Sequence, residues 1–141
     1  MTAATIPACD RRRLQDAVTT APPIDSEVLS SHCMGNVSFA LALLGELETS
    51  GKQHVDAIVL HATSDEPHAA AEAAHSLKGA AAIIGAEPLR EKAAEIEAAG
   101  HDGETSLLFD MVHDLRGEMD RCLTYIPILR TDLQRRSTPA R

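Results

Sequence analysis

Aromatic residues are almost missing from this chain of 141 residues, which has no Trp, one Tyr and two Phe. Yet 44% of the residues are hydrophobic, so a core must be built from Leu, Ile, Val, Met and the many Ala side chains. Small side chains suit closely packed helices, and no long alternating run of β-branched residues predicts a strand. The sequence therefore predicts an all-α fold and, from its length, one domain with tails.

Basic residues are also scarce, because 13 Lys and Arg stand against 21 Asp and Glu, a formal net charge of −8. General nucleic-acid binding depends on a basic face, so we expect no nucleic-acid partner. Three widely spaced cysteines, Cys9, Cys33 and Cys122, predict no disulfide framework and fit a reducing cytoplasm. No apolar run reaches the roughly 18–20 residues that span a bilayer, and charged residues interrupt the N-terminus early. We therefore expect a cytoplasmic protein without a membrane segment.

Domain boundaries are indicated by composition. Residues 1–23 mix Thr, Ala, Pro and charge and end in two prolines, which is typical of a disordered leader. Within it, residues 11–13 are three arginines, either a solvated arm or a contact for an anionic partner. Residues 24–134 are predicted to form the domain, and residues 135–141 a flexible tail.

Capping residues and the apolar period predict one short helix and four long ones. Asp25 or Ser26 can cap the short helix, which we expect to cover one end of a bundle, and Asn36 can cap the next one. The four amphipathic helices are expected over about residues 36–63, 64–84, 87–99 and 104–133. Short loops between them, including one at residues 100–103, predict an antiparallel four-helix bundle with an N-terminal lid helix.

Two residues interrupt the helical pattern. The apolar period continues through Gly51, which favours one long helix over residues 36–63, but a glycine costs roughly 1 kcal/mol against Ala there. A kink or break at residues 49–52 is the alternative. Pro127 lies inside the last helix and lacks a backbone donor, so we expect a kink near residues 123–127.

Residues 74–80, Ala-His-Ser-Leu-Lys-Gly-Ala, have two different faces at 100° per residue. The face opposite His75 is apolar and consists of Ala70, Ala73, Leu77, Ala80, Ala81 and Ile84. The residues within about 60° of His75 are His68, Ala71, Lys78, Gly79 and Ala82. One face can therefore pack on a core, and the other presents an imidazole among small residues that a large, flat partner can reach.

The segment His75-Ser76-Leu77-Lys78-Gly79, followed by small residues and by Ile83-Ile84-Gly85-Ala86, resembles the signature of histidine-containing phosphotransfer (HPt) domains. These domains shuttle phosphoryl groups in two-component phosphorelays, and the resemblance extends across residues 24–133 in the order of the helices. It implies that His75 is the phosphoacceptor, usually through Nε2. It further implies that Lys78 helps to neutralise the phosphoryl charge and that Gly79 lets a partner come close.

The same resemblance implies that Glu97 accepts a hydrogen bond from the other ring nitrogen, the alternative being a plain surface carboxylate. The implied partners are response-regulator receiver domains, either separate or part of a hybrid sensor kinase, which supply the aspartate and Mg²⁺. The chain would then be a monomeric phosphocarrier without a cofactor and not an enzyme, because it contains no ATP-binding kinase domain.

General chemistry supports these roles. A neutral imidazole with a pKa of about 6.5 is a competent nucleophile at cytoplasmic pH. Lys78 lies three residues after His75, on the same helical surface. Phosphoryl transfer mainly requires positioning and charge neutralisation. The mid-helix Gly79 costs about 1 kcal/mol against Ala, and close approach of a partner would explain it.

Two other readings remain open. A non-phosphorylated module could bind a response regulator or kinase through the same face. A metal protein is suggested by His54, His61, His68 and His75, but residues seven apart on a helix are about 10.5 Å apart, so chelation would need a cross-helix pair such as His61 with His68. His68 could instead border the docking site. Cys33 and Cys122 are expected in the core.

Overall fold

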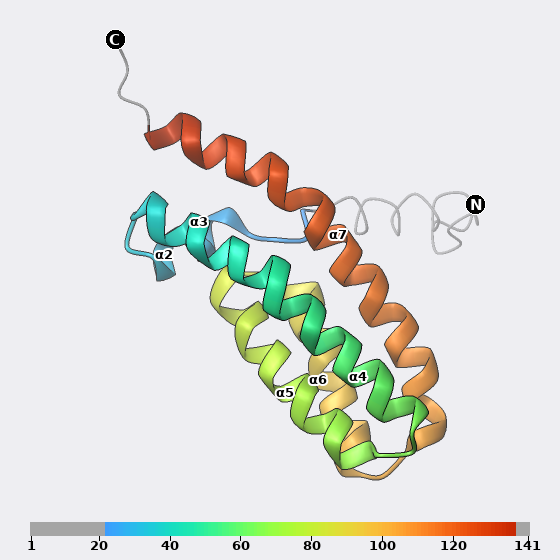
Figure 1. Cartoon of the computed structure of the whole chain (residues 1–141). Helices are drawn as coiled ribbons and strands as arrows, with labels where there is room; N and C mark the ends of the chain where they lie inside the picture. Colours follow the sequence, from blue (N-terminus) through green and yellow to red (C-terminus); the bar gives the residue numbers. More distant parts are fainter. Residues whose placement is uncertain (1–21, 138–141) are drawn as a thin grey trace, which may run out of the picture.

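The computed structural model describes residues 22–137, and every element in this part of the chain is a helix (Figure 1). In order, the elements are α2 (Ser26–His32), α3 (Val37–Glu46), a π-helical turn (Leu47–Gly51), α4 (Lys52–Thr63), α5 (Pro67–Ile84), α6 (Glu87–His101) and α7 (Thr105–Ser137). The predicted all-α fold, a bundle of four long antiparallel helices with a short lid helix, is confirmed. Residues 1–21 of the predicted leader, with Cys9 and the three arginines, and the last four residues of the tail lie outside the described residues. At the end of the predicted leader, Pro23 is buried, so the domain begins slightly earlier than predicted.

The core consists of aliphatic side chains from all the helices. Its largest fully buried members include Leu29 of α2, Leu44 of α3, Ile58 of α4, Leu77 of α5, Ile96 of α6 and Leu115 of α7. Burying one such side chain contributes roughly 1.5–3 kcal/mol. Cys33 and Cys122 are also buried, as predicted, and no charged or polar residue is buried among residues 22–137.

The lid helix α2 is attached to the end of α5 at its N-terminus. Its N-cap is Asp25, whose carboxylate accepts hydrogen bonds from the backbone N–H groups of Glu27 and Val28. The Asp25 N–H itself donates to the carbonyl of Gly85 at 2.8 Å, where α5 ends. Gly85 has a φ of 78°, and a Cβ there would lie 2.7 Å from the Asp25 carbonyl oxygen. Only glycine meets both demands.

The long helix from α3 to α4 continues without a break, and the π-helical turn lies where Gly51 suggested an irregularity. Gly51 is buried, and a Cβ there would lie 2.8 Å from Met119 Cε and 2.9 Å from Leu47 Cδ1. The glycine therefore lets α7 approach the long helix closely. One extra residue in a turn is how a π-bulge is accommodated inside an α-helix.

Two predicted boundaries differ from the structure. Helix α6 continues through His101, so the loop predicted at residues 100–103 is wrong in its first half, and Gly100 is buried between helices. Helix α7 extends to Ser137, past the expected end near Leu133, and contains Pro127. Figure 1 shows that α7 changes direction in its C-terminal part, as expected of a helix with an internal proline.

No single helix among residues 22–137 has the length and apolar composition to cross a membrane. Helix α2 and the segment Val37–Thr63 reach that composition only as a pair, and they are bent by 112° relative to one another.

Candidate functional site

His75 lies in the middle of α5, with its side chain 68% exposed. The helix runs from Pro67 to Ile84 with Gly85 as its C-cap, so the predicted end near Ile84 is confirmed. Leu77 and Ile84 are buried on the other side of the same helix. The helix is therefore anchored by its apolar face, and the imidazole points away from the core.

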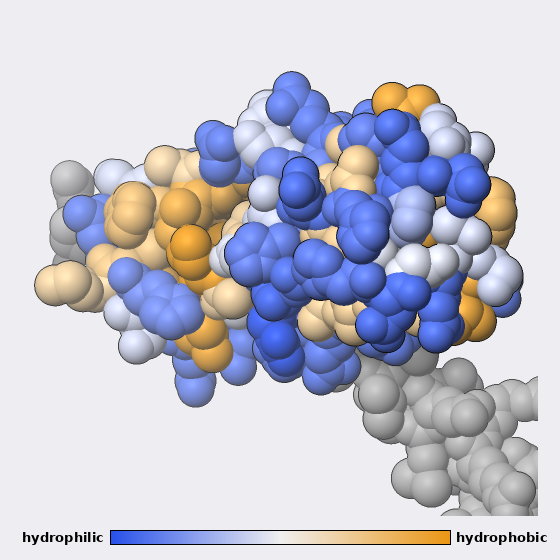
Figure 2. Space-filling view, turned by 90° about the horizontal axis from the view of Figure 1, so that it is seen from below, coloured by the Kyte–Doolittle hydropathy of each residue, from blue (hydrophilic) through white to orange (hydrophobic). Residues whose placement is uncertain are grey.

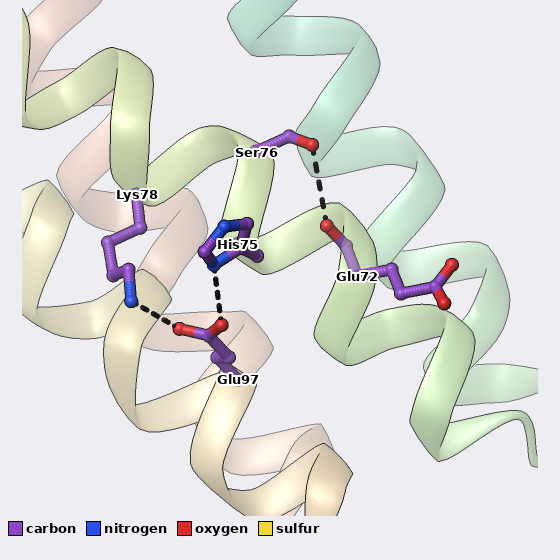
Figure 3. A network of polar contacts seen from close by, with 5 residues as sticks. All are labelled: Glu72, His75, Ser76, Lys78 and Glu97. Atoms are coloured by element: carbon purple, nitrogen blue, oxygen red, sulfur yellow. Dashed lines mark hydrogen bonds and ion pairs between the residues drawn. The ribbon is translucent and has the colours of Figure 1, made fainter.

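Glu97 of α6 joins His75 and Lys78 in one polar network (Figure 3). Its Oε2 atom lies 2.6 Å from His75 Nδ1, and its Oε1 atom accepts a hydrogen bond from Lys78 Nζ at 2.6 Å. The Glu97 side chain is 17% exposed and that of Lys78 31%. The predicted contact between Glu97 and the ring of His75 is thus present, and the carboxylate has a second partner that the sequence did not predict.

The network favours the ionised form of the Glu97 carboxyl and, through it, one tautomer of the His75 ring. Lys78, first, and then His75 lower the pKa of the Glu97 carboxyl, although burial opposes them. An ionised carboxylate can only accept hydrogen bonds, so Nδ1 of His75 must carry a proton. A neutral ring has one N–H, which leaves Nε2 with a free lone pair on the exposed side.

Close packing between α5 and α6 places Glu97 beside His75. Gly100, one turn after Glu97, is buried against α5. A Cβ at Gly100 would lie 2.4 Å from the Pro67 carbonyl oxygen and 2.8 Å from the Cβ of Ala71. Ala71 lies one turn before His75, so the glycine sets the distance between the two helices at the site.

The expectation that Ala71 lies on the exposed face around His75 is wrong, because this residue is fully buried. A helical wheel gives the direction of a side chain but not the width of the buried stripe, and the close approach of α6 widens it. Gly79 and Ala82 are exposed, as expected. A Cβ at Gly79 would meet no atom within 4 Å. His68 is exposed at the start of α5, with its ring centroid 6.4 Å from that of His101.

A sequence model of the Hpt domain family matches residues 42–125, which is 84 of the 141 residues. The chain belongs to the Hpt domain family. The family carries out histidine phosphotransfer in phosphorelays and interacts there with receiver domains. The matched range of this Hpt domain contains all of α5 and α6, and therefore His75, Lys78 and Glu97.

The fold of this Hpt domain is similar to the crystal structure of histidine-containing phosphotransfer protein B (HptB) from Pseudomonas aeruginosa PAO1. The two share a TM-score of 0.74 at 20% sequence identity, and the match covers 80% of this chain and 98% of the other. No curated protein has a sequence significantly similar to the chain.

A shallow hollow of about 470 Å³ opens beside His75, between α5 and α6 of the Hpt domain. Ala71 forms its buried floor, and its walls come from Glu72, His75, Ser76, Glu97 and His101. The Ser76 hydroxyl is 3.4 Å from the carbonyl of Glu72 in its own helix (Figure 3). His101 was not identified from the sequence, although it lies four residues after Glu97 and thus on the same face.

Two of the histidines that suggested a metal site have other partners in the Hpt domain. His61 pairs with Glu66 at 3.1 Å, and His68 lies against His101. In the described part of the chain, residues 22–137, no group of three or more His, Cys, Asp or Glu side chains is placed to hold a metal ion.

Apolar side chains gather at one end of the Hpt domain, on the face seen in Figure 2. At the end where α2, the start of α3 and the end of α5 lie, the exposed apolar residues are Met34, Phe39 and Ile83. A small apolar hollow of about 120 Å³ lies between α3 and α5, with Leu43, Ala80 and Ile83 in its lining. This end offers a partner an apolar surface, whereas much of the rest of this face is polar.

Proposed function

We propose that His75 accepts a phosphoryl group from the aspartyl phosphate of a receiver domain and passes it to the aspartate of another receiver. The observation that carries the proposal is the hydrogen bond between Nδ1 of the exposed His75 and Glu97. It leaves Nε2 as the nucleophilic atom, on the side open to a partner. Histidine phosphotransfer by the family supports this assignment.

In the transfer, the lone pair of His75 Nε2 attacks phosphorus and forms the N–P bond. The P–O bond to the aspartate breaks, and its electron pair returns to the aspartate as a free carboxylate. The ring keeps its Nδ1 proton and becomes formally cationic, and the Glu97 carboxylate faces that charge at 2.6 Å. The reverse sequence of events delivers the phosphoryl group to the next receiver.

Other residues would serve docking and charge neutralisation. Lys78 would supply a positive charge to the phosphoryl oxygens, while the bare Gly79 and the small Ala82 would let the receiver's active-site loops approach. His68 and His101 would border the contact. The receiver would provide the aspartate and Mg²⁺, so this domain acts as a carrier and not as an autonomous catalyst. We also propose that it works in the cytoplasm as a monomer.

The test is incubation of the purified chain with each phosphorylated receiver domain of the source organism. We expect at least one receiver to label the wild-type chain with an acid-labile, base-stable phosphoryl group, as a phosphoramidate requires. His75→Gln should take no label. His113→Gln, which changes an exposed histidine on α7, is the matched control and should be labelled normally.

Two results would contradict the proposal: no receiver labels the wild type, or His75→Gln is labelled as well as the wild type. If His75→Ala still binds and regulates a receiver normally, the domain is a non-phosphorylated binding module instead.

A further inference from the structure

Lys78 is already engaged before any phosphoryl group is present. Its ammonium lies 2.6 Å from Glu97 Oε1, and it is the first cause of the lowered pKa of that carboxyl. Both side chains are less than one-third exposed, so water screens this ion pair less than an open surface pair. Neutralising a phosphoryl group on His75 therefore requires Lys78 to give up, or at least weaken, an existing bond.

Because of the geometry of the imidazole, the Glu97 carboxylate and a phosphoryl group on His75 would compete for the Lys78 ammonium. The two ring nitrogens point in nearly opposite directions, and Nδ1 faces Glu97. A phosphoryl group on Nε2 would therefore lie on the far side of the ring from the carboxylate. Figure 3 shows His75 and Lys78 reaching from α5 to the same carboxylate of α6. The long, flexible lysine side chain can rotate outward, whereas Glu97 also remains bound to the ring.

The phosphoryl group attracts the Lys78 ammonium more strongly than the Glu97 carboxylate does. A phosphoryl group carries close to two negative charges and three strong acceptor oxygens, whereas the carboxylate carries one charge. The cationic ring that forms on phosphorylation gives Glu97 a stronger remaining partner at Nδ1. Both changes favour movement of the ammonium from Glu97 to the phosphoryl group.

We propose that Lys78 exchanges partners during the phosphorelay cycle, bound to Glu97 when His75 is free and to the phosphoryl group when His75 is phosphorylated. Glu97 is then a positioning residue with two effects, since it orients the ring and competes for the lysine. The stabilisation that Lys78 gives to phosphohistidine is reduced by the bond that it breaks. This inference rests on the proposed phosphoacceptor role of His75.

A double-mutant cycle tests the exchange. The four proteins are wild type, Lys78→Met, Glu97→Gln and the double variant, where Met keeps most of the lysine stem and Gln keeps an acceptor for Nδ1–H. Each is equilibrated with the receiver that labels the wild type, and the ratio of phosphohistidine to phosphoaspartate is measured. We expect Lys78→Met to lower this ratio in both backgrounds, and to lower it about threefold to tenfold more in the Glu97→Gln background.

A matched cycle controls for general effects of charge. Lys92 and Glu95 form an ion pair on α6, away from His75, with their charged atoms 3.4 Å apart, and Lys92 also lies 4.0 Å from Asp114 of α7. The cycle of Lys92→Met with Glu95→Gln should show no such coupling. Far-UV circular dichroism checks that every variant is folded.

The outcomes separate the two proposals. Suppose that the wild type is labelled, but that Lys78→Met lowers the ratio of phosphohistidine to phosphoaspartate by the same factor in the wild-type and Glu97→Gln backgrounds, or by a smaller factor in the Glu97→Gln background. The proposed exchange of partners is then wrong, and the phosphoacceptor role of His75 stands. If no receiver labels the wild type on His75, the proposed function fails and the exchange falls with it.

Discussion

The two oxygens of the Glu97 carboxylate have different partners, an imidazole and an ammonium, and this division has a consequence for stability. Both partners lower the pKa of the folded carboxyl, Lys78 more than His75. A lowered pKa in the folded state means that the unfolded chain holds the proton more tightly. The stabilisation is therefore complete above the unfolded pKa of about 4.3 and is lost as the pH falls through the folded pKa.

We therefore expect Glu97→Gln to reduce the free energy of unfolding by about 1 kcal/mol at pH 7, and by progressively less as the pH falls below about 4. Urea unfolding of the wild type and the variant at pH 7, 5 and 3 measures this difference. Glu95→Gln, an exposed carboxylate on the same helix, is the control. A wild-type advantage that stays constant down to pH 3 would mean that the ion pair contributes nothing to folding.

Gly79 allows stability and docking to be separated. Its Cβ position is empty to 4 Å, so Gly79→Ala should stabilise the isolated domain by up to about 1 kcal/mol, through helix propensity alone. The added methyl group would nevertheless stand on the face that meets the receiver, so phosphotransfer should slow by about tenfold or more. Thermal unfolding and single-turnover transfer measure the two effects.

Gly117 on α7 provides the control for this substitution, because it is exposed and a Cβ there also meets nothing within 4 Å. Gly117→Ala should stabilise the domain similarly and leave transfer unchanged. Equal transfer rates for Gly79→Ala and wild type would remove Gly79 from the docking surface.

Among the helices, the pair α5 and α6 shows what sequence periodicity can and cannot reveal. The apolar period and the caps predicted both helices and placed His75 on an exposed face. The sequence placed Gly100 in a loop after this helix, because a glycine near a helix end suggests a loop. The contact of Gly100 with Ala71 depends on how two helices cross, which no single-helix pattern contains.

That contact yields a prediction about the site. Gly100→Ala should force α6 away from α5, because the new methyl group meets the Pro67 carbonyl and Ala71 at 2.4 and 2.8 Å. Overpacking of this kind costs about 1–3 kcal/mol, and the same displacement should weaken the bond between His75 and Glu97. Urea unfolding and ¹⁵N NMR of the His75 ring, which reports the tautomer, measure the two consequences.

Gly117→Ala again serves as the control and should leave the ring spectrum unchanged. If Gly100→Ala is as stable as wild type and keeps the same His75 tautomer, the close packing of α5 and α6 does not position Glu97.

At the scale of the whole molecule, composition was sufficient for the fold class, and the order of caps and glycines was sufficient for the bundle. The polar network could not be predicted in full from the sequence, because it depends on how side chains from two helices meet in space. The resemblance to the family implied an acceptor for the ring at Glu97, but only the structure assigns the second oxygen of that carboxylate to Lys78. The helical period of α5 does not show which face of α6 packs against it. The contacts of the Glu97 carboxylate with His75 and Lys78 depend on the orientation of both helices.

The attachment of the lid to the rest of the bundle is a second property of the whole molecule. Helix α2 has 7 residues, too few to be stable in isolation. It is held by the bond from Asp25 to Gly85 and by the ring of His32, whose Nδ1 atom donates to the carbonyl of Ile83 at 2.6 Å. Cys33 is the C-cap of α2, and its side chain is buried.

The two buried cysteines can report whether the lid opens separately from the bundle. Burial raises the pKa of the Cys33 thiol and that of Cys122 to about 12, so neither thiol reacts with DTNB until it is exposed. In a Cys9→Ser background, we expect Cys33 to be labelled first, through local opening of α2, and Cys122 only at the rate of global unfolding.

His32→Ala should speed the labelling of Cys33 about fivefold, for a lost bond of about 1 kcal/mol, and leave the labelling rate of Cys122 unchanged. Mass spectrometry of timed samples distinguishes the two sites. Equal labelling rates for Cys33 and Cys122 in the parent protein would instead show that the lid unfolds only together with the whole bundle.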